Sequence, residues 1–273
     1  MGIVSQREKE THARIQTQRN LKDAAKMLKV MENEIDKFFF NRLKRSMSQK
    51  RAIIMAETLG DAMTKGRLIS KSIVRGGSRT SKQRIFTWLF LQRDEYNPFE
   101  HFEEKCFSVS SLMFHTKKIC DPVEFNTGVY LTRHCLERVY ERIENLTTLE
   151  STLKILSPYI SALLYSQDDC DAMAENDTFI LVSNTSYLVV KSQLKEDSYS
   201  ERDYVITTFL PIELWSKKRK ETLTPIVDSF NILNESPDEI DTKLIAVIKP
   251  SLIEKTLDRP LTFDDIRLIR GFL

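Results

Sequence analysis

Apolar residues near the start of the chain recur at the heptad spacing of a helix. Leu21, Leu28 and Ile35 lie seven residues apart, and the second heptad position between them is also apolar over residues 21–38. This narrow seam is typical of a coiled coil, although about two and a half heptads are too few to stand alone. The pattern therefore predicts a helix that packs within this domain or across a homo-oligomer, followed by a second helix over residues 50–74.

From Ile85 onward, short apolar runs replace most of this helical periodicity. The first of these runs is 85–91. Strands are predicted at 178–183, 186–194, 204–210 and 243–249, with 106–116 leaning the same way. Asn184 and Thr185 predict a tight turn between two of these strands. Helices are predicted at 132–145, at 149–165, from Ile212 and from Thr262. The expected class is α+β, with a basic helical N-terminal region followed by helices packed on a small antiparallel β-sheet.

The two parts of the chain differ in charge. Residues 1–90 hold 20 Lys and Arg residues against 8 Asp and Glu residues, whereas the whole chain has 41 against 39. We expect a basic helical module over 1–95, with a flexible basic loop at 75–84, and an α+β domain over 96–273. The asymmetry points to a polyanion partner, to the acidic remainder of the chain, or to a solvated surface. The candidate nucleic-acid contacts are Arg42, Lys44, Arg45, Arg75, Arg79, Lys82 and Arg84.

Several classes of protein are not expected. The sequence has no run of 18 apolar residues and no apolar stretch near its start, so we expect neither a membrane helix nor a secretory leader. The four cysteines form no C-x-x-C pair, which predicts reduced thiols rather than a zinc or redox site: Cys106, Cys120, Cys135 and Cys170. A cytoplasmic protein without a metal or cofactor is expected.

The strongest candidate site is the segment L-T-R-H-C-L-E-R-V-Y-E-R-I over residues 131–143. His134, Arg138 and Arg142 are four residues apart, so on a helix they share one face. Histidine can exchange a proton near neutral pH, and arginine binds phosphate oxygens in a two-pronged manner. The same charges could instead form surface ion pairs. The opposite, core face is predicted to hold Leu136, Val139, Tyr140 and Ile143.

A helix with this His/Arg pattern is followed by a second helix and by strands that end in I-T-T-F-L-P at 206–211. Over about residues 128–211, this order resembles the barnase–EndoU–colicin–RelE class of ribonuclease toxins, in particular its small domains that open with H-x-x-x-R-x-x-x-R. Such domains end their sheet in a threonine followed by an aromatic residue, here Thr207 and Phe209. The family often has tyrosine at the second position, so its phenolic hydroxyl is absent at Phe209.

The resemblance implies metal-independent RNA cleavage, in which the ribose 2′-hydroxyl attacks the adjacent phosphate and leaves a cyclic phosphate and a free 5′-hydroxyl. It assigns His134 as general acid or base, Arg138 and Arg142 as phosphate ligands, and Thr207 as a hydrogen-bond donor to the phosphate. The first hypothesis is therefore a toxin-like or defence-associated endoribonuclease, whose partners would be RNA and an inhibitor protein. The alternatives are a non-catalytic nucleic-acid-binding protein of a mobile element and a structural or partner-binding protein.

Overall fold

The computed structural model has an α+β fold, as the sequence predicts. It describes residues 5–40, 54, 72–76, 84–96, 104–115, 123–165, 178–194, 202–234, 242–249, 261 and 266–272. The helices in these ranges are α1 (Gln6–Phe40), α3 (Arg133–Arg142), α4 (Leu149–Tyr165), the 3-10 helix η1 (Ile212–Leu214) and α6 (Lys217–Asn234). The strands are β1 (Ser72–Gly76), β2 (Arg84–Tyr96), β3 (Cys106–His115), β4 (Val123–Thr132), β5 (Thr178–Val182), β6 (Ser186–Leu194), β7 (Arg202–Pro211), β8 (Thr242–Ile248) and β9 (Arg267–Phe272).

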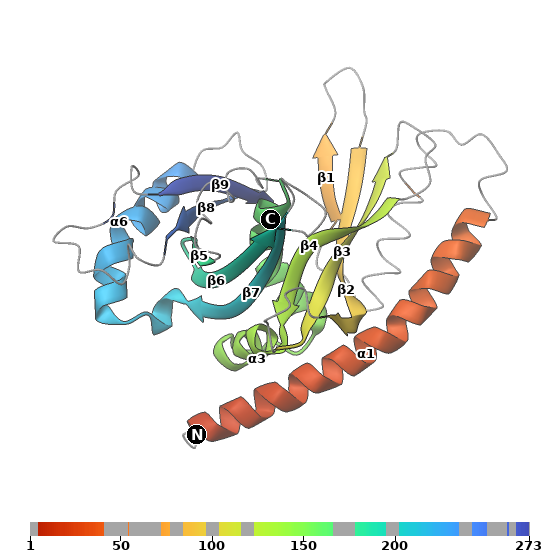
Figure 1. The fold of residues 1–273 in the computed structure, drawn as a ribbon, viewed down its shortest axis with the longest axis horizontal. Helices are drawn as coiled ribbons and strands as arrows, with labels where there is room; N and C mark the ends of the chain where they lie inside the picture. Colours follow the sequence, from red (N-terminus) through yellow and green to blue (C-terminus); the bar gives the residue numbers. More distant parts are fainter. Residues whose placement is uncertain are drawn as a thin grey trace.

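The described strands form one nine-stranded sheet in the order β1-β2-β3-β4-β7-β6-β5-β8-β9 (Figure 1). Neighbouring strands are antiparallel except β4 and β7, which pair in parallel where Leu131 faces Ile206. Strand pairing crosses the domain boundary expected at residue 95, because β2 is paired with β3 and Trp88 faces Leu112. The segment 84–95 is thus part of the sheet and not of a separate helical module.

Helices cover both faces of the sheet. Along β5, Phe179 and Leu181 belong to one hydrophobic cluster, and Ile180 and Val182 belong to another. Successive side chains of a strand point to opposite faces, so the two clusters lie on opposite sides of the sheet. The first cluster is covered by α3 and α4, and its members include Leu136, Val139, Leu153, Leu156 and Ile160. The second is covered by α6 through Leu223, Ile226 and Val227.

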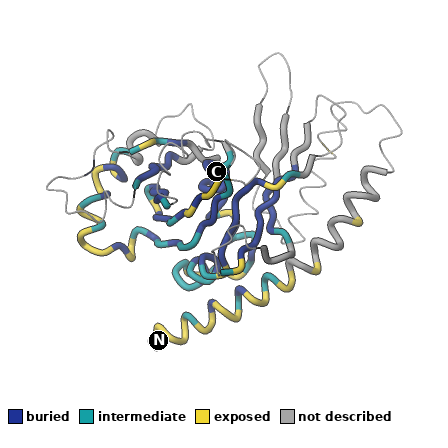
Figure 2. Tube along the Cα trace, in the orientation of Figure 1, coloured by how far each residue is buried: buried dark blue, intermediate teal, exposed yellow. Residues whose placement is uncertain are grey.

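Helix α1 runs across α3 and continues past it, away from the body of the molecule (Figure 1). Its first half is mostly exposed, although Ala13 and Thr17 are buried (Figure 2). The helix expected over 21–38 is confirmed as part of α1, and Leu21 packs against the first hydrophobic cluster. The side chains of the remaining seam residues, from Ala24 to Phe38, lie outside the described residues.

Three local expectations differ from the structure. Residues 72–74, which were expected to end a helix, belong to β1. The two ends of the loop expected at 75–84 belong to β1 and β2. Ile54 is helical, and the other residues of these two segments lie outside the described residues. The helix expected from Ile212 begins as the 3-10 turn η1, and α6 starts only at Lys217.

The C-terminal helix expected from Thr262 is wrong over its described part, which is strand β9. Ile269 is buried in the first cluster and the partly buried Leu268 packs against the second, so consecutive apolar residues here reflect a strand that has an apolar cluster on each face. By contrast, the turn expected at Asn184 and Thr185 is confirmed, since the Ser183 amide donates to the Ser186 carbonyl at 2.9 Å.

Candidate functional site

The start of α3 is fixed by a single buried hydroxyl. The Oγ1 atom of Thr132 accepts a hydrogen bond from the Cys135 amide at 2.9 Å, which is the standard bond of a helix N-cap. The same hydroxyl donates to the Thr207 carbonyl at 3.2 Å. One side chain therefore defines where the helix begins and holds that end against β7.

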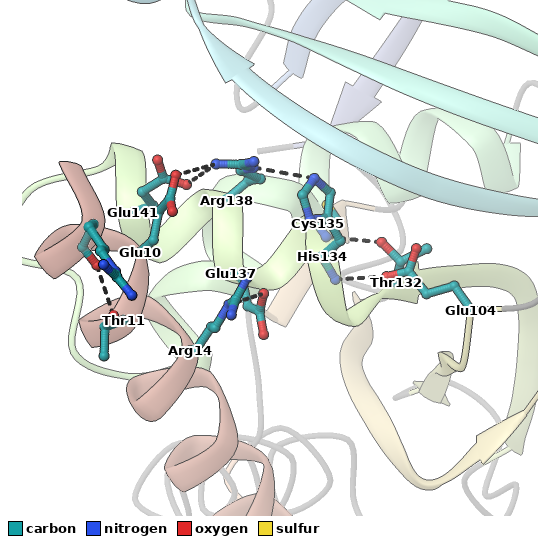
Figure 3. A network of polar contacts seen from close by, with 11 residues as sticks. Glu10, Thr11, Arg14, Glu104, Thr132, His134, Cys135, Glu137, Arg138 and Glu141 are labelled. Atoms are coloured by element: carbon teal, nitrogen blue, oxygen red, sulfur yellow. Dashed lines mark hydrogen bonds and ion pairs between the residues drawn. The ribbon is translucent and has the colours of Figure 1, made fainter.

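His134 lies in the first turn of α3, and Arg138 follows one turn later. The Nε atom of Arg138 donates to Nε2 of His134 at 3.2 Å, and both residues are half-buried (Figure 3). An imidazole nitrogen that accepts a hydrogen bond carries no proton, so the neutral ring has its proton on Nδ1. The helix thus brings these two predicted residues together, with Nδ1 of the histidine as a hydrogen-bond donor.

Two carboxylates surround the guanidinium group of Arg138. Its Nη1 atom is paired with Glu141 on the same helix and lies 3.9 Å from a carboxylate oxygen of Glu10 on α1 (Figure 3). The side chain of Arg138 is 26% exposed, which leaves part of the cation in contact with solvent. Its charge is therefore partly compensated by acidic groups from two different helices.

Arg142 has a different environment from Arg138. Its Nη1 atom donates to the backbone carbonyl of Phe209 on β7. Burial lowers the pKa of the Arg142 guanidinium, and the nearby charge of Arg138 lowers it further. The sequence predicts that His134, Arg138 and Arg142 lie on an accessible face. In the structure this face of α3 lies along β7, and Arg142 contacts the strand. Arg142 joins α3 to the sheet.

Thr207 is the extra residue of a β-bulge. Val190 pairs with Ile206 and Val189 pairs with Thr208, so Thr207 itself has no partner in the register. Its Oγ1 atom donates to the Val189 carbonyl at 3.2 Å. To donate to a phosphate, as the resemblance implies, this hydroxyl would have to give up that bond. The ring of Phe209 is 1% exposed and belongs to the core.

A residue that the sequence analysis did not single out lies at the same end of α3. The Oε1 atom of Glu104 accepts a hydrogen bond from the His134 amide at 2.9 Å, where the helix dipole favours a negative charge. Cys106 pairs with Thr132 in the β3–β4 hairpin, and this register places Glu104 beside the helix start. The two residues are 30 positions apart, so no local pattern could have joined them.

The side chains of all seven predicted nucleic-acid contacts lie outside the described residues. Arg75 is in β1 and Arg84 begins β2, and their side chains are not described. Arg42, Lys44, Arg45, Arg79 and Lys82 lie outside the described residues. In the part of the chain that the structure describes, no group of three His, Cys, Asp or Glu residues could hold a metal ion. No helix of that part combines the length and apolar character needed to span a membrane.

Comparison with known proteins adds no relative. No protein-family model matches the chain, no curated protein matches it, and no solved structure matches it.

Proposed function

We propose that this protein is a metal-independent endoribonuclease whose reaction centre lies where α3 begins, next to β7. The observation that carries the proposal is the hydrogen bond between Arg138 and His134 at 3.2 Å. It brings an imidazole and a cation together on one helix face, and this combination suits a reaction that moves protons around a phosphate. The carbonyl of Thr207 on the neighbouring strand is tied to the same helix end through Thr132.

We assign His134 as the general acid in its imidazolium form. A neutral imidazole is too weak an acid to protonate a leaving oxygen, so both ring nitrogens must carry a proton and the bond from Arg138 to Nε2 must open. In that role it protonates the 5′-oxygen as the bond from phosphorus to this oxygen breaks. The ribose 2′-oxygen forms the new bond to phosphorus, and its proton passes to a base.

Glu104 is the carboxylate best placed to accept that proton. It lies beside the first turn of α3, where its Oε1 atom is bound to the His134 amide at 2.9 Å. A carboxylate has further lone pairs, so this single bond leaves it able to accept a proton from the 2′-hydroxyl. Arg138 would stabilise the negative charge that accumulates on the phosphate oxygens in the transition state. The products are a 2′,3′-cyclic phosphate and a 5′-hydroxyl.

The test is to incubate the full-length chain with a labelled single-stranded RNA in the presence of EDTA. Cleavage that yields cyclic phosphate ends is expected, and His134→Ala should slow it by about 10²- to 10⁴-fold. His12→Ala provides a matched control, because His12 is an exposed histidine on α1. If His134→Ala cleaves as fast as His12→Ala, or if EDTA stops the reaction, the proposal is wrong.

A second candidate is a protein that binds nucleic acid without cleaving it. The favouring observation is that Arg142 is already bound to the Phe209 carbonyl and the hydroxyl of Thr207 to the Val189 carbonyl, so two of the four expected catalytic groups are held by backbone carbonyls. A protein of this kind would bind RNA in a salt-dependent way and leave it intact in the assay above. A structural or partner-binding protein would do neither.

A further inference from the structure

The contact between α1 and α3 is made largely by polar side chains. Besides the approach of Glu10 to Arg138, Arg14 lies 3.8 Å from Glu137 and Gln6 donates to Glu141. Further along α1, Asn20 donates to the Tyr140 hydroxyl at 2.7 Å, and Gln16 donates to the Thr147 carbonyl at 2.6 Å. We refer to these five contacts, the last of which is to the segment that follows α3, as the α1–α3 interface.

This interface buries little apolar surface. In the first half of α1, Ala13 is buried and Leu21 is partly buried, whereas Ile15 on the same helix is 61% exposed. Apolar burial is the main source of tight packing, and each polar group of the interface can bind water instead. Helix α1 can therefore separate from α3 at a modest cost in free energy, while α3 remains held by its own hydrophobic core.

We propose that α1 is an inhibitory helix, whose Glu10 occupies at Arg138 the place of an RNA phosphate oxygen. This inference rests on the proposed phosphate-binding role of Arg138. A carboxylate and a phosphate both present anionic oxygens to a guanidinium group, so the two compete for one cation. Glu10 comes from a separate helix and can leave with it, whereas Glu141 belongs to α3 itself (Figure 3).

Docking of α1 is expected to weaken the binding of an RNA phosphate at Arg138. With α1 in place, Arg138 faces two carboxylates, and a phosphate that approaches is repelled by both. When α1 moves away, one carboxylate remains and the cation is more exposed. RNA binding and α1 docking are therefore mutually exclusive at this residue, and RNA should displace the first half of α1.

The test measures the affinity of the full-length chain for a fluorescent single-stranded RNA at about 100 mM salt. Glu10→Gln keeps the shape of the side chain but removes its charge, and it is expected to tighten binding about 2- to 5-fold, the factor for a partly exposed ion pair. The control is Asp23→Asn, which removes one negative charge from the same helix at a residue paired with Lys26. In an Arg138→Ala background, Glu10→Gln should have no effect beyond that of the control.

A second measurement follows amide hydrogen exchange in residues 6–21. Exchange should become faster when saturating RNA is added to the original protein, because RNA displaces α1. Equal affinities for the Glu10→Gln and Asp23→Asn variants, or exchange that RNA leaves unchanged, would overturn the inhibitory role. A tighter Glu10→Gln complex without cleavage would retain this inference and remove the ribonuclease proposal. If no variant binds RNA, both proposals are wrong.

Discussion

Arg142 of α3 donates a hydrogen bond to the carbonyl of Phe209 of β7, 67 residues further along the chain. Arg138, one turn earlier on the same helix face, makes side-chain contacts with His134, Glu141 and Glu10 instead. Two arginines that are equivalent in the sequence pattern therefore differ in what they do. Arg142 holds the helix against the sheet, and Arg138, whose side chain is 26% exposed, is bound by side chains of α1 and α3.

Replacing Arg142 should lower stability more than replacing Arg138. Arg142→Gln leaves the Phe209 carbonyl without its donor, and an unsatisfied buried acceptor costs about 1–3 kcal/mol. Arg138→Gln removes the partly exposed pair with Glu10, whose contribution is about 0–1 kcal/mol. It also removes the pair with Glu141, whose side chain is 6% exposed and keeps its hydrogen bond from Gln6. Urea unfolding of both variants gives the two free energies. Equal losses in the free energy of unfolding would show that the bond to the Phe209 carbonyl contributes no more than the contacts of Arg138.

Arg138→Lys should lower cleavage without unfolding the protein. A lysine keeps the positive charge, but it cannot bind His134 and a phosphate with a planar, multi-pronged group. We expect kcat/KM for RNA to fall by about 10-fold or more, with unchanged circular dichroism and an unchanged melting temperature. Full activity in this variant would mean that only the charge of Arg138 matters.

Thr132→Ala should destabilise the helix start. The substitution removes the bond from the Cys135 amide and the bond to the Thr207 carbonyl, and the loss of an N-cap typically costs about 0.5–2 kcal/mol. Thr132→Ser keeps the hydroxyl and serves as the control, with most of the stability retained. Denaturant midpoints that fall equally in both variants would show that the methyl group matters and the hydroxyl does not.

Alkaline pH should destabilise the fold through Cys106. Burial raises the pKa of this thiol to about 12 from an ordinary value of 9.0, and the Glu104 carboxylate adds to the shift. Between these pH values the unfolded thiol loses its proton and the folded one keeps it, so the unfolding free energy falls as pH rises. The slope from this group is at most about 1.4 kcal/mol per pH unit. Urea unfolding from pH 8 to 11 should give a shallower slope for Cys106→Ala, and an unchanged slope would contradict the assignment.

The basic N-terminal part should contribute to RNA affinity through phosphate contacts. In the full-length chain, Arg79→Gln combined with Lys82→Gln should weaken RNA binding for every sequence tested. Each lost phosphate contact should reduce the slope of log affinity against log salt by about 0.7 for single strands. The slope is measured between about 50 and 200 mM salt, a range over which binding through several phosphate contacts weakens strongly. An unchanged slope would place the phosphate contacts elsewhere.

The sequence predicts those features that follow from local pattern. The apolar spacing in residues 131–143 correctly predicts that Leu136 and Val139 face the core, and Ile143 packs at its edge. The positions of Glu10 and Glu104 could not be predicted, because α1 docking and the β3–β4 register bring them to α3 from distant parts of the chain. At Thr262 a local helix-start signal suggested a helix, but residues 267–272 join the sheet, where Ile269 packs against the first cluster and the partly buried Leu268 against the second.

The parallel pairing of β4 with β7 has a consequence for the order of folding. The strands on either side of this junction pair mostly with neighbours close in sequence, whereas Thr132 and Thr207 meet across 75 residues. Closing a long loop costs more entropy than closing a hairpin, so we expect the two halves of the sheet to form early and their junction to form late. Because α3 lies at that junction, a nascent or partly folded chain would lack the arrangement of His134 and Thr207. Any activity that depends on this arrangement would then arise only after the chain has completed folding.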